Sequence, residues 1–519
     1  MNTCPCNWTK RLLMVAVVAT SLGLSACGGG GGGGTTTGTT TGSTTGTGTG
    51  TGSGTGSSGS SGSGSTSSGT SSTATAFRGD ILLGSPTATG IKVNVYAADQ
   101  SGTAWILYGS SPEALIRQTE RVALRAGTPV EFSLTGLQPN LRHHYRLHFQ
   151  ADGQTGDSAG EVHNFHTARA SGSTFTFTLQ GDSHPERLNQ QFNAELYIRT
   201  LETIATDAPD FHILMGDDFS VDTIDPSRIT RALVTERYTQ QRPWLTRVAR
   251  RSPLFLVNGN HEQAARYLLD GTPENVAVWA QTARNSHYSQ PGPDDFYSGN
   301  PELVPHIGLL RNHYAWTWGD ALFVVMDPYW SSPVAVDNVY GSSTKDKTSM
   351  WEVTHGDAQY EWLKRTLEGS KAKYKFVLAH HVMGGGRGGI ELAGSWEWGG
   401  RNAKGIDEFR TQRSTWAVPI HQLFVAHRVN IFFQGHDHVW VRQQLDGVTY
   451  QTLSQPADPN YALYFDEAYR SGEKHPNTGY TRVTVSPTQI RVEYVRSVLP
   501  AHETASRRQG AVVTAYTLP

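Results

Sequence analysis

Residues 175–184 read Phe-Thr-Phe-Thr-Leu-Gln-Gly-Asp-Ser-His, a run rich in aromatic and β-branched residues that stops at Gly181 and continues as Asp182-Ser183-His184. This composition predicts a buried β-strand, and the glycine permits a sharp turn directly after it. Residues two apart in extended backbone share a face, so Asp182 and His184 can converge on one ion. The stretch therefore predicts a strand that delivers metal-binding side chains at its carboxyl end.

The same pattern of a strand followed by donor side chains occurs four more times. Each time, a short apolar run precedes Gly or Ala and then carboxylate, amide or imidazole groups. The four segments are Gly216-Asp217-Asp218, Gly259-Asn260-His261-Glu262, Ala379-His380-His381 and Gly435-His436-Asp437-His438. One such segment alone is typical of a turn, but five in this order predict one shared site.

Helical segments lie between the predicted strands. Residues 192–205 and 360–367 have helical periodicity, and residues 226–250 are expected to be largely helical. Apolar strands with helices between them predict a layered α/β domain, here assigned to residues 171–519. Ligands of such domains bind beyond the carboxyl ends of the strands, which is where all five segments lie.

The preceding region, residues 77–170, is predicted to be all-β. Residues 93–96 and 103–108 are short runs rich in β-branched and aromatic residues. Leu-Thr-Gly-Leu-Gln-Pro-Asn at 134–140 leads into a predicted strand that contains Tyr145. This arrangement resembles the fibronectin-type-III-like sandwich, and another small β-sandwich is the alternative.

The N-terminus is predicted to be a targeting signal. Lys10 and Arg11 precede an apolar run, residues 12–26, which is shorter than the about 20 residues of a membrane span. The run ends in Leu24-Ser25-Ala26-Cys27, which resembles the lipobox of bacterial lipoproteins, whereas an ordinary secretory signal is the alternative. The resemblance implies that residues 1–27 are a signal peptide and that Cys27 is lipidated.

The segment after Cys27 is expected to be a disordered linker, residues 28–76. Residues 28–73 are only Gly, Thr and Ser, so they have no side chains with which to build a core. In lipoproteins, Asp after the lipidated Cys favours the inner membrane. Because Gly28 occupies that position, we expect a lipid-anchored protein of the bacterial cell envelope, at the outer membrane.

Composition excludes several classes of protein. All three cysteines lie at or before residue 27, so a disulfide scaffold, thiolate metal site or cysteine nucleophile is excluded from the folded region. The 43 basic and 45 acidic residues give no basic footprint for duplex nucleic acid. Any metal must be held by His, Asp, Glu or Asn. The sequence leaves the oligomeric state open.

Together, the five segments resemble the calcineurin-like metallophosphoesterase superfamily, whose pattern is Asp-x-His, Gly-Asp, Gly-Asn-His-(Asp/Glu), His and Gly-His-x-His. The resemblance covers roughly residues 173–500 and implies a four-layer αββα sandwich. The β-sandwich in front and the segment 359–363 are similar to the purple acid phosphatase arrangement. Those phosphatases place an iron-binding Tyr where this chain has Ser220, and they lack an equivalent of His184.

The resemblance implies two metal ions chosen from Fe, Mn and Zn, which suit this donor set. One ion would take Asp182, His184 and His438, and the other would take Asn260, His380 and His436, with Asp217 as the bridge. His381 is the alternative to His380. Asp218 and Asp437, which adjoin ligands, are expected to be turn residues or to support the ligands.

The implied reaction is phosphate ester hydrolysis of the phosphomonoesterase type. Two ions roughly 3.5–4 Å apart lower the pKa of a bridging water, and the resulting hydroxide attacks phosphorus in line. Protonated His261 would offset developing charge, and Glu262 is expected to orient His261. The segment 383–416 is either a lid that presents Arg to phosphate or a surface insertion. A phosphodiesterase and a non-catalytic, surface-tethered adhesion protein are the alternative functions.

Overall fold

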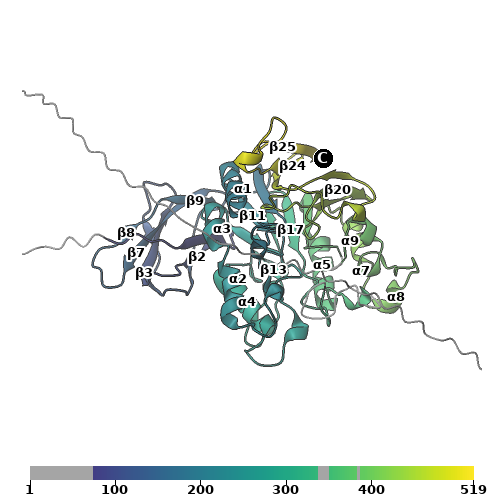
Figure 1. Cartoon of the computed structure of the whole chain (residues 1–519), viewed down its shortest axis with the longest axis horizontal. Helices are drawn as coiled ribbons and strands as arrows, with labels where there is room; N and C mark the ends of the chain where they lie inside the picture. Colours follow the sequence, from purple (N-terminus) through teal and green to yellow (C-terminus); the bar gives the residue numbers. More distant parts are fainter. Residues whose placement is uncertain (1–73, 337–349, 383–385) are drawn as a thin grey trace, which may run out of the picture. The chain divides into compact units, whose positions relative to one another are not determined.

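The computed structural model describes residues 74–336, 350–382 and 386–519 (Figure 1). The described residues form one compact unit. The predicted signal peptide, Cys27 and the linker up to residue 73 lie outside the described residues. So do residues 383–385 of the glycine-rich segment.

The N-terminal region is a small β-sandwich. One side consists of β1 (Asp80–Gly84), β2 (Ile91–Tyr96) and β6 (Val130–Leu134). The other consists of β3 (Gly102–Gly109), β4 (Arg117–Gln118), β5 (Val122–Leu124), β7 (Arg142–Ala151), β8 (Ser158–Ala159) and β9 (His163–His166). Val93, Ile106 and Leu147 are buried between the two sides. The strands predicted around residues 93, 105 and 147 are confirmed.

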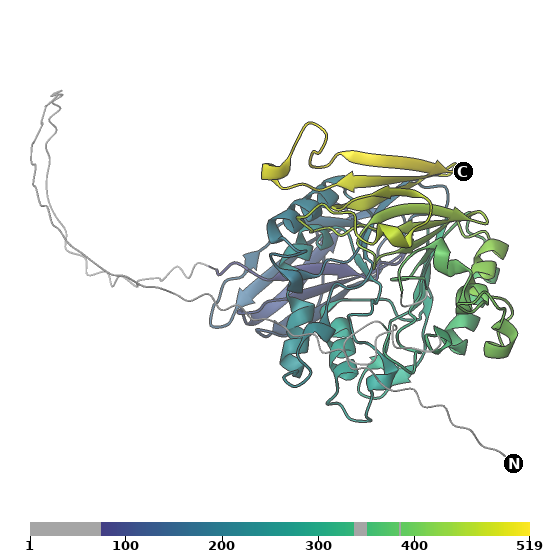
Figure 2. The same cartoon turned by 45° about the vertical axis from the view of Figure 1, so that its right-hand side comes forward.

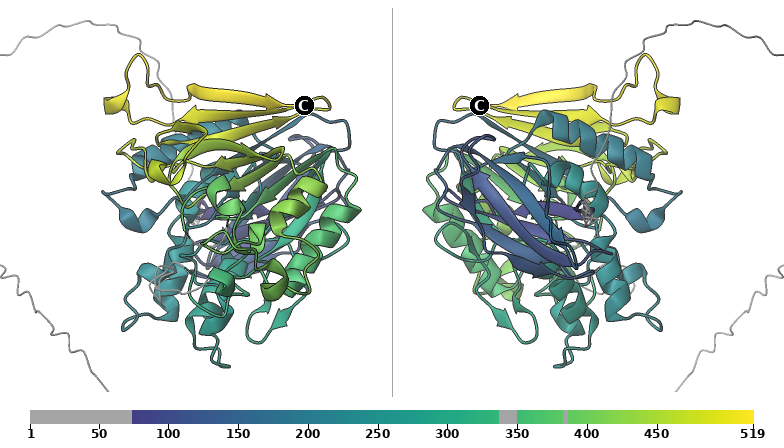
Figure 3. Two further views of the ribbon diagram at one scale, coloured as in Figure 1. Left: turned by 90° about the vertical axis from the view of Figure 1, so that its right-hand side faces the viewer. Right: turned by 90° about the vertical axis from the view of Figure 1, so that its left-hand side faces the viewer.

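The β-sandwich continues into a larger sheet, which the sequence did not predict. This nine-stranded sheet has the order β25-β24-β23-β10-β11-β12-β1-β2-β6. Its remaining strands are β10 (Phe175–Gln180), β11 (Phe211–Leu214), β12 (Leu254–Leu256), β23 (Gly479–Val485), β24 (Ile490–Arg496) and β25 (Val512–Leu518). A single parallel pair, Gly84 with Leu254, joins β1 to β12. The C-terminal strands lie at the opposite end of the sheet, at the top in Figure 3.

A second sheet of eight strands faces the first. Its order is β13-β16-β17-β18-β19-β21-β20-β22. These strands are β13 (Ser298–Gly299), β16 (Tyr314–Trp318), β17 (Ala321–Val325), β18 (Tyr374–Leu378), β19 (Ile431–Gln434), β20 (Trp440–Leu445), β21 (Val448–Thr452) and β22 (Glu473–His475). Phe177, Phe323 and Phe376 belong to the core between the two sheets. A separate small hairpin joins β14 (Leu303–Val304) to β15 (Gly308–Leu309).

Helices cover the outer faces of both sheets (Figures 1 and 2). On the first sheet lie α1 (Ala194–Asp207), α2 (Arg231–Thr239), α3 (Arg242–Ala249) and α4 (Val276–His287). On the second lie α5 (Asp357–Gly369), α6 (Ile390–Ala393), α7 (Trp396–Gly399), α8 (Phe409–Gln412) and α9 (Ile420–Ala426). The predicted four-layer αββα sandwich is confirmed. None of the helices in the described ranges has the length and apolar character needed to cross a membrane.

Residues 226–250 are largely helical, as predicted, but they form two helices, α2 and α3. α2 begins only after Thr230, whose side chain accepts a hydrogen bond from the backbone of Leu233. The chain starts a new helix, α3, at Arg242, with Pro243 in its first turn. Proline has no backbone N–H to donate and fixes φ, so it favours a helix start over continuation of the preceding helix.

The strands are arranged so that the predicted donors meet. β10, β11 and β12 run parallel in the first sheet, and β17, β18 and β19 run parallel in the second. The five segments directly follow β10, β11, β12, β18 and β19. Their donors therefore gather where the carboxyl ends of the two sets of strands come together.

Candidate metal centre

The five segments converge on one cluster of donor atoms. Among the described residues, four overlapping groups of Asp and His have ligand atoms within 4.8 Å of one another. The groups are Asp182 with His184 and His438, Asp182 with Asp217 and His380, His184 with Asp217 and His261, and His380 with His381 and His436. Asp217 belongs to two groups and connects the loop after β10 with the loop after β18.

Distances around Asp182 fit coordination of a single ion. His438 Nε2 lies 3.0 Å from Asp182 Oδ2, and His184 Nε2 lies 4.0 Å from the same oxygen. His184 Nε2 also lies 3.9 Å from Asp217 Oδ2. Two ligands at about 2.1 Å from one ion are roughly 3.0 Å apart at a right angle and roughly 4.2 Å apart when opposed. The four side chains therefore fit a first ion.

A second set surrounds His380. Its Nε2 lies 2.9 Å from Asp217 Oδ2, and its Nδ1 donates to the Met215 carbonyl at 2.7 Å. That hydrogen bond leaves Nε2 to face the cluster, as is typical of metal-binding histidines. Neighbouring His381 stacks on His436 with ring centroids 3.9 Å apart, and its Nδ1 lies 2.6 Å from the Tyr329 hydroxyl. The contact with Asp217 favours His380 as the ligand.

The predicted ligands are buried. The seven side chains predicted as ligands are at most 5% exposed. They are Asp182, His184, Asp217, Asn260, His380, His436 and His438. His184 Nε2 is buried without a hydrogen-bond partner, which is costly for a polar atom unless something coordinates it. A metal ion would satisfy that nitrogen, so the donors fit the group that the sequence implies.

Ser220 supports His184 from the other side of its ring. His184 Nδ1 lies 2.9 Å from Glu186 Oε1 and 3.2 Å from Ser220 Oγ. Both contacts fix the ring so that Nε2 points at the two aspartates. The residue at the position of the iron-binding Tyr of purple acid phosphatases thus orients a histidine. Sequence analysis did not find the role of Glu186, because nothing marks it beyond its position two residues after His184.

The backbone bends sharply at the donors. His184, Asp217, His436 and His438 all have φ between 48° and 66°, a region that non-glycine residues seldom occupy. Gly216, with φ of 97°, has no such restriction, and a Cβ there would lie 2.8 Å from His380 Nδ1. These bends turn each donor into the crevice directly after its strand.

Glu262 holds the loop that carries Asp217. Its carboxylate accepts hydrogen bonds from the backbone N–H groups of Asp217, Asp218, Phe219 and Gly259, at 2.6–3.1 Å. The sequence-based expectation was that Glu262 orients His261. In the structure its oxygens are occupied by these four amides, because the loops after β11 and β12 pack against each other there.

His261 is oriented by Asp222 instead. Its Nδ1 lies 2.7 Å from Asp222 Oδ1, and its backbone N–H donates to Asp217 Oδ1 at 3.0 Å. Burial lowers the pKa of His261, but Asp217 and Asp222 together raise it to about 10. The side chain is 19% exposed, more than the ligands. The two carboxylates thus favour the protonated form of the His261 imidazole.

A model of the calcineurin-like phosphoesterase family matches residues 175–440, just over half of the chain. The chain belongs to the calcineurin-like phosphoesterase family. It is therefore a metal-dependent phosphoester hydrolase, and the family uses a dinuclear metal centre of the kind that these donors fit.

Solved structures share the fold over most of the chain. A structure of PhoD has a TM-score of 0.57 at 15% identity, covering 84% of this chain and 89% of that one. The purple acid phosphatase PPD1 from yellow lupin (Lupinus luteus) has a TM-score of 0.53 at 14% identity, covering 84% of this chain and 73% of that one. No curated protein matched significantly. The predicted purple-acid-phosphatase-like organisation is confirmed.

Two acidic residues beside the ligands of this phosphoesterase have supporting contacts. Asp218 Oδ1 accepts a hydrogen bond from Ser183 at 2.6 Å, and burial raises the pKa of Asp218 well above its ordinary value. Asp437 accepts from Tyr469 at 2.5 Å and from the backbone of Gly388 at 2.8 Å. Neither belongs to the metal-binding groups found among the described residues.

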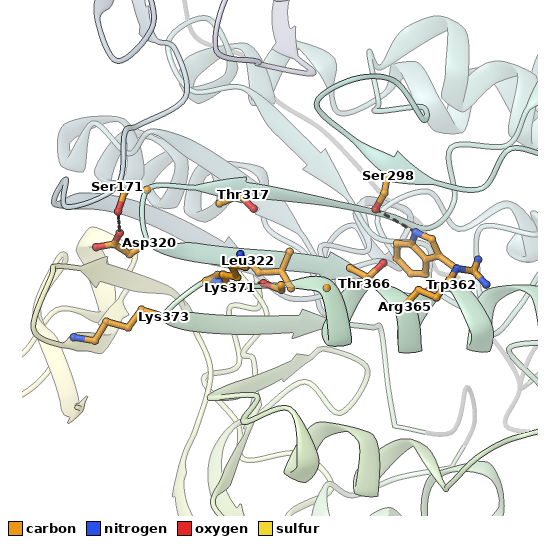
Figure 4. Close-up of a pocket in the computed structure, with 14 residues that line it drawn as sticks. Ser171, Ser298, Thr317, Asp320, Leu322, Trp362, Arg365, Thr366, Lys371 and Lys373 are labelled. Atoms are coloured by element: carbon orange, nitrogen blue, oxygen red, sulfur yellow. Dashed lines mark hydrogen bonds between the residues drawn. The ribbon is translucent and has the colours of Figure 1, made fainter.

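A groove of about 970 Å³ lies away from the phosphoesterase cluster (Figure 4). α5 contributes Trp362 and Arg365 to its wall, and the segment after α5 contributes Lys371. None of the predicted ligands lines it. Here the convergence of donor atoms, and not the size of a cavity, identifies the functional site.

Proposed function

We propose that this chain hydrolyses phosphate monoesters in the manner of an acid phosphatase. The observation that carries the proposal is the position of Asp217 Oδ2, which lies 2.9 Å from His380 Nε2 and 3.9 Å from His184 Nε2. One carboxylate oxygen thus borders both ligand sets, as a bridge between two ions requires. Ions held by these residues would supply Lewis acidity and activate water near neutral pH.

His261 supplies the proton in this proposal. Asp222 accepts from Nδ1–H, so the Nε2–H of the imidazolium is left to face the substrate. That proton offsets charge on the departing oxygen as its bond to phosphorus breaks. Glu262 contributes indirectly, since its four backbone contacts hold Asp217 in position.

Carboxylate, amide and imidazole donors support Fe, Mn or Zn as the ions. Ser220 cannot provide the tyrosinate-to-iron charge transfer that colours purple acid phosphatases. We therefore expect an iron-loaded protein without a strong tyrosinate absorption band. The alternative function, a non-catalytic adhesion protein, would require that some metal-binding residues have been lost. Every donor position of the family pattern is occupied here.

We further propose that the mature chain starts at lipidated Cys27 and is anchored at the outer membrane of a bacterium. The support is the sequence Leu24-Ser25-Ala26-Cys27 followed by Gly28. A linker made only of Gly, Thr and Ser would place the enzyme at a distance from the lipid anchor.

Metal analysis combined with turnover tests the catalytic proposal. Purified protein is assayed with 4-nitrophenyl phosphate, a monoester, and bis(4-nitrophenyl) phosphate, a diester. We expect two ions per chain and a higher kcat/KM for the monoester. A higher value for the diester would identify a phosphodiesterase, and two bound ions without turnover of either ester would contradict the hydrolase assignment.

A further inference from the structure

We propose that Arg387 contacts the phosphoryl group of the substrate and makes the site select dianionic monoesters over monoanionic diesters. This inference rests on the proposed function and names the residue that sets its substrate class. Arg387 belongs to the segment 383–416 after β18. The sequence left open whether this segment is a lid that presents Arg to phosphate or a surface insertion.

Arg387 is attached to the metal-binding loop after β19. Its Nη1 donates to the backbone carbonyl of His436 and to Asp437 Oδ1, the latter at 3.0 Å. Asp437 is 2% exposed and lies between the two predicted ligands His436 and His438. The guanidinium therefore borders the ligand loop directly and is fixed to it at two points.

Support of Asp437 and a ring contact of Arg387 hold the guanidinium in place. Asp437 is itself held by the Tyr469 hydroxyl at 2.5 Å and by the backbone N–H of Gly388 at 2.8 Å. Arg387 Cζ lies 3.7 Å above the ring of Phe465, whose centroid is 6.3 Å from that of His438. An arginine held in this way loses little further side-chain entropy when it binds an anion.

The guanidinium keeps donors for a ligand. Nη1 makes the hydrogen bonds of Arg387 to the described residues, whereas an arginine has five N–H donors in all. The side chain is 33% exposed, so the remaining donors are accessible from solvent.

Charge and oxygen count distinguish the two classes of ester. A phosphate monoester dianion presents three non-bridging oxygens, whereas a diester monoanion presents two and carries an organic group on the third oxygen. A guanidinium binds phosphate through paired N–H donors, and the binding becomes stronger with each added charge and accepting oxygen. A fixed arginine beside the centre therefore favours the monoester.

The test compares two esters with the same leaving group, 4-nitrophenyl phosphate and methyl 4-nitrophenyl phosphate. Arg387→Gln should lower the monoester-to-diester ratio of kcat/KM about 10- to 100-fold, as expected for a hydrogen bond to a charged group. Arg387→Lys keeps the charge and should restore part of the ratio. The control, Arg365→Gln in the groove of Figure 4, removes the same charge far from the site and should leave the ratio unchanged.

Binding of inorganic phosphate, measured by calorimetry on metal-loaded protein, gives a readout independent of turnover. Arg387→Gln should weaken it by a similar factor while metal content stays at the wild-type value. Equal losses for both esters, loss of metal, or unchanged phosphate affinity would show that Arg387 only fastens its loop. If wild-type protein with two ions hydrolyses neither ester, the proposed function fails, and phosphate affinity still decides whether Arg387 contacts the anion.

Discussion

The Nδ1 atom of His261 lies 2.7 Å from Asp222 Oδ1, and this pairing, not one with Glu262, sets the direction of the imidazole. The backbone reinforces it, because Val221 N–H donates to the His261 carbonyl at 3.0 Å. Asp222 is 1% exposed, and among the described residues its ion-pair partner is His261. His261 and the carboxylate that orients it thus come from two different loops, after β12 and β11.

The pairing of His261 with Asp222 predicts how kcat of variants at both positions depends on the leaving group of the substrate. His261→Ala should retain both metals and lose about 10²–10⁴ in kcat for an alkyl phosphate, the usual range for general acid–base catalysis. The loss should be smaller for 4-nitrophenyl phosphate, because nitrophenolate departs without a proton. Asp222→Asn should produce the same pattern more weakly. Equal defects for both leaving groups would rule out the acid role.

A second prediction concerns His212, a buried residue that is not one of the predicted ligands or catalytic residues. Burial lowers the pKa of His212 to about 3, and its ring lies between Thr178 Oγ1 at 2.9 Å and Gln180 Oε1 at 3.1 Å. Because the unfolded chain binds the proton more readily, His212 stabilises the fold fully above about pH 6.5 and progressively less as the pH falls towards 3.

Comparison of wild type with His212→Gln tests the predicted direction of this pH dependence. The difference in free energy of unfolding between wild type and variant, measured with urea on metal-free protein, should be constant above about pH 6.5. Below that it should shrink by up to about 1.4 kcal/mol per pH unit. His306→Gln, at an exposed histidine, is the matched control. A difference that stays constant down to pH 4.5 would contradict the prediction.

The third prediction concerns location. Wild-type protein should partition with membranes, and Cys27→Ser should either release it or leave the signal peptide attached. Fractionation of cells, with mass spectrometry of the N-terminus, measures both outcomes. Ser25→Thr is a mild control at the same segment and should behave as wild type. Unchanged membrane fractionation of a processed Cys27→Ser protein would remove the case for a lipid anchor.

The centre was predictable from sequence because its signals are local. Each donor segment directly follows an apolar strand, so composition and order alone placed Asp182, Asp217, Asn260, His380 and His436 at strand ends. The four-layer fold followed from the family resemblance. The structure brings the predicted His and Asp donors together, and the assignment of residues to each ion stays a prediction.

Relationships between distant segments were not predictable. The junction of β1 with β12 rests on one residue pair, Gly84 with Leu254, and leaves no periodic signal in either strand. Asp222 lies in a short 3₁₀ turn, Val221–Thr223, and becomes the partner of His261 only when two loops fold together. Such contacts depend on tertiary packing, which local patterns do not encode.

The central claim is that one carboxylate, Asp217, joins two ions into a single hydrolytic centre. Metal-free wild-type protein should be titrated with Mn²⁺ while bound metal and 4-nitrophenyl phosphate turnover are followed together, with Asp217→Asn in parallel. We predict that activity appears as the second equivalent binds, and that Asp217→Asn loses affinity at both sites together with its activity. Full activity at one equivalent, or an Asp217→Asn protein that binds two ions with wild-type affinity, would contradict the account.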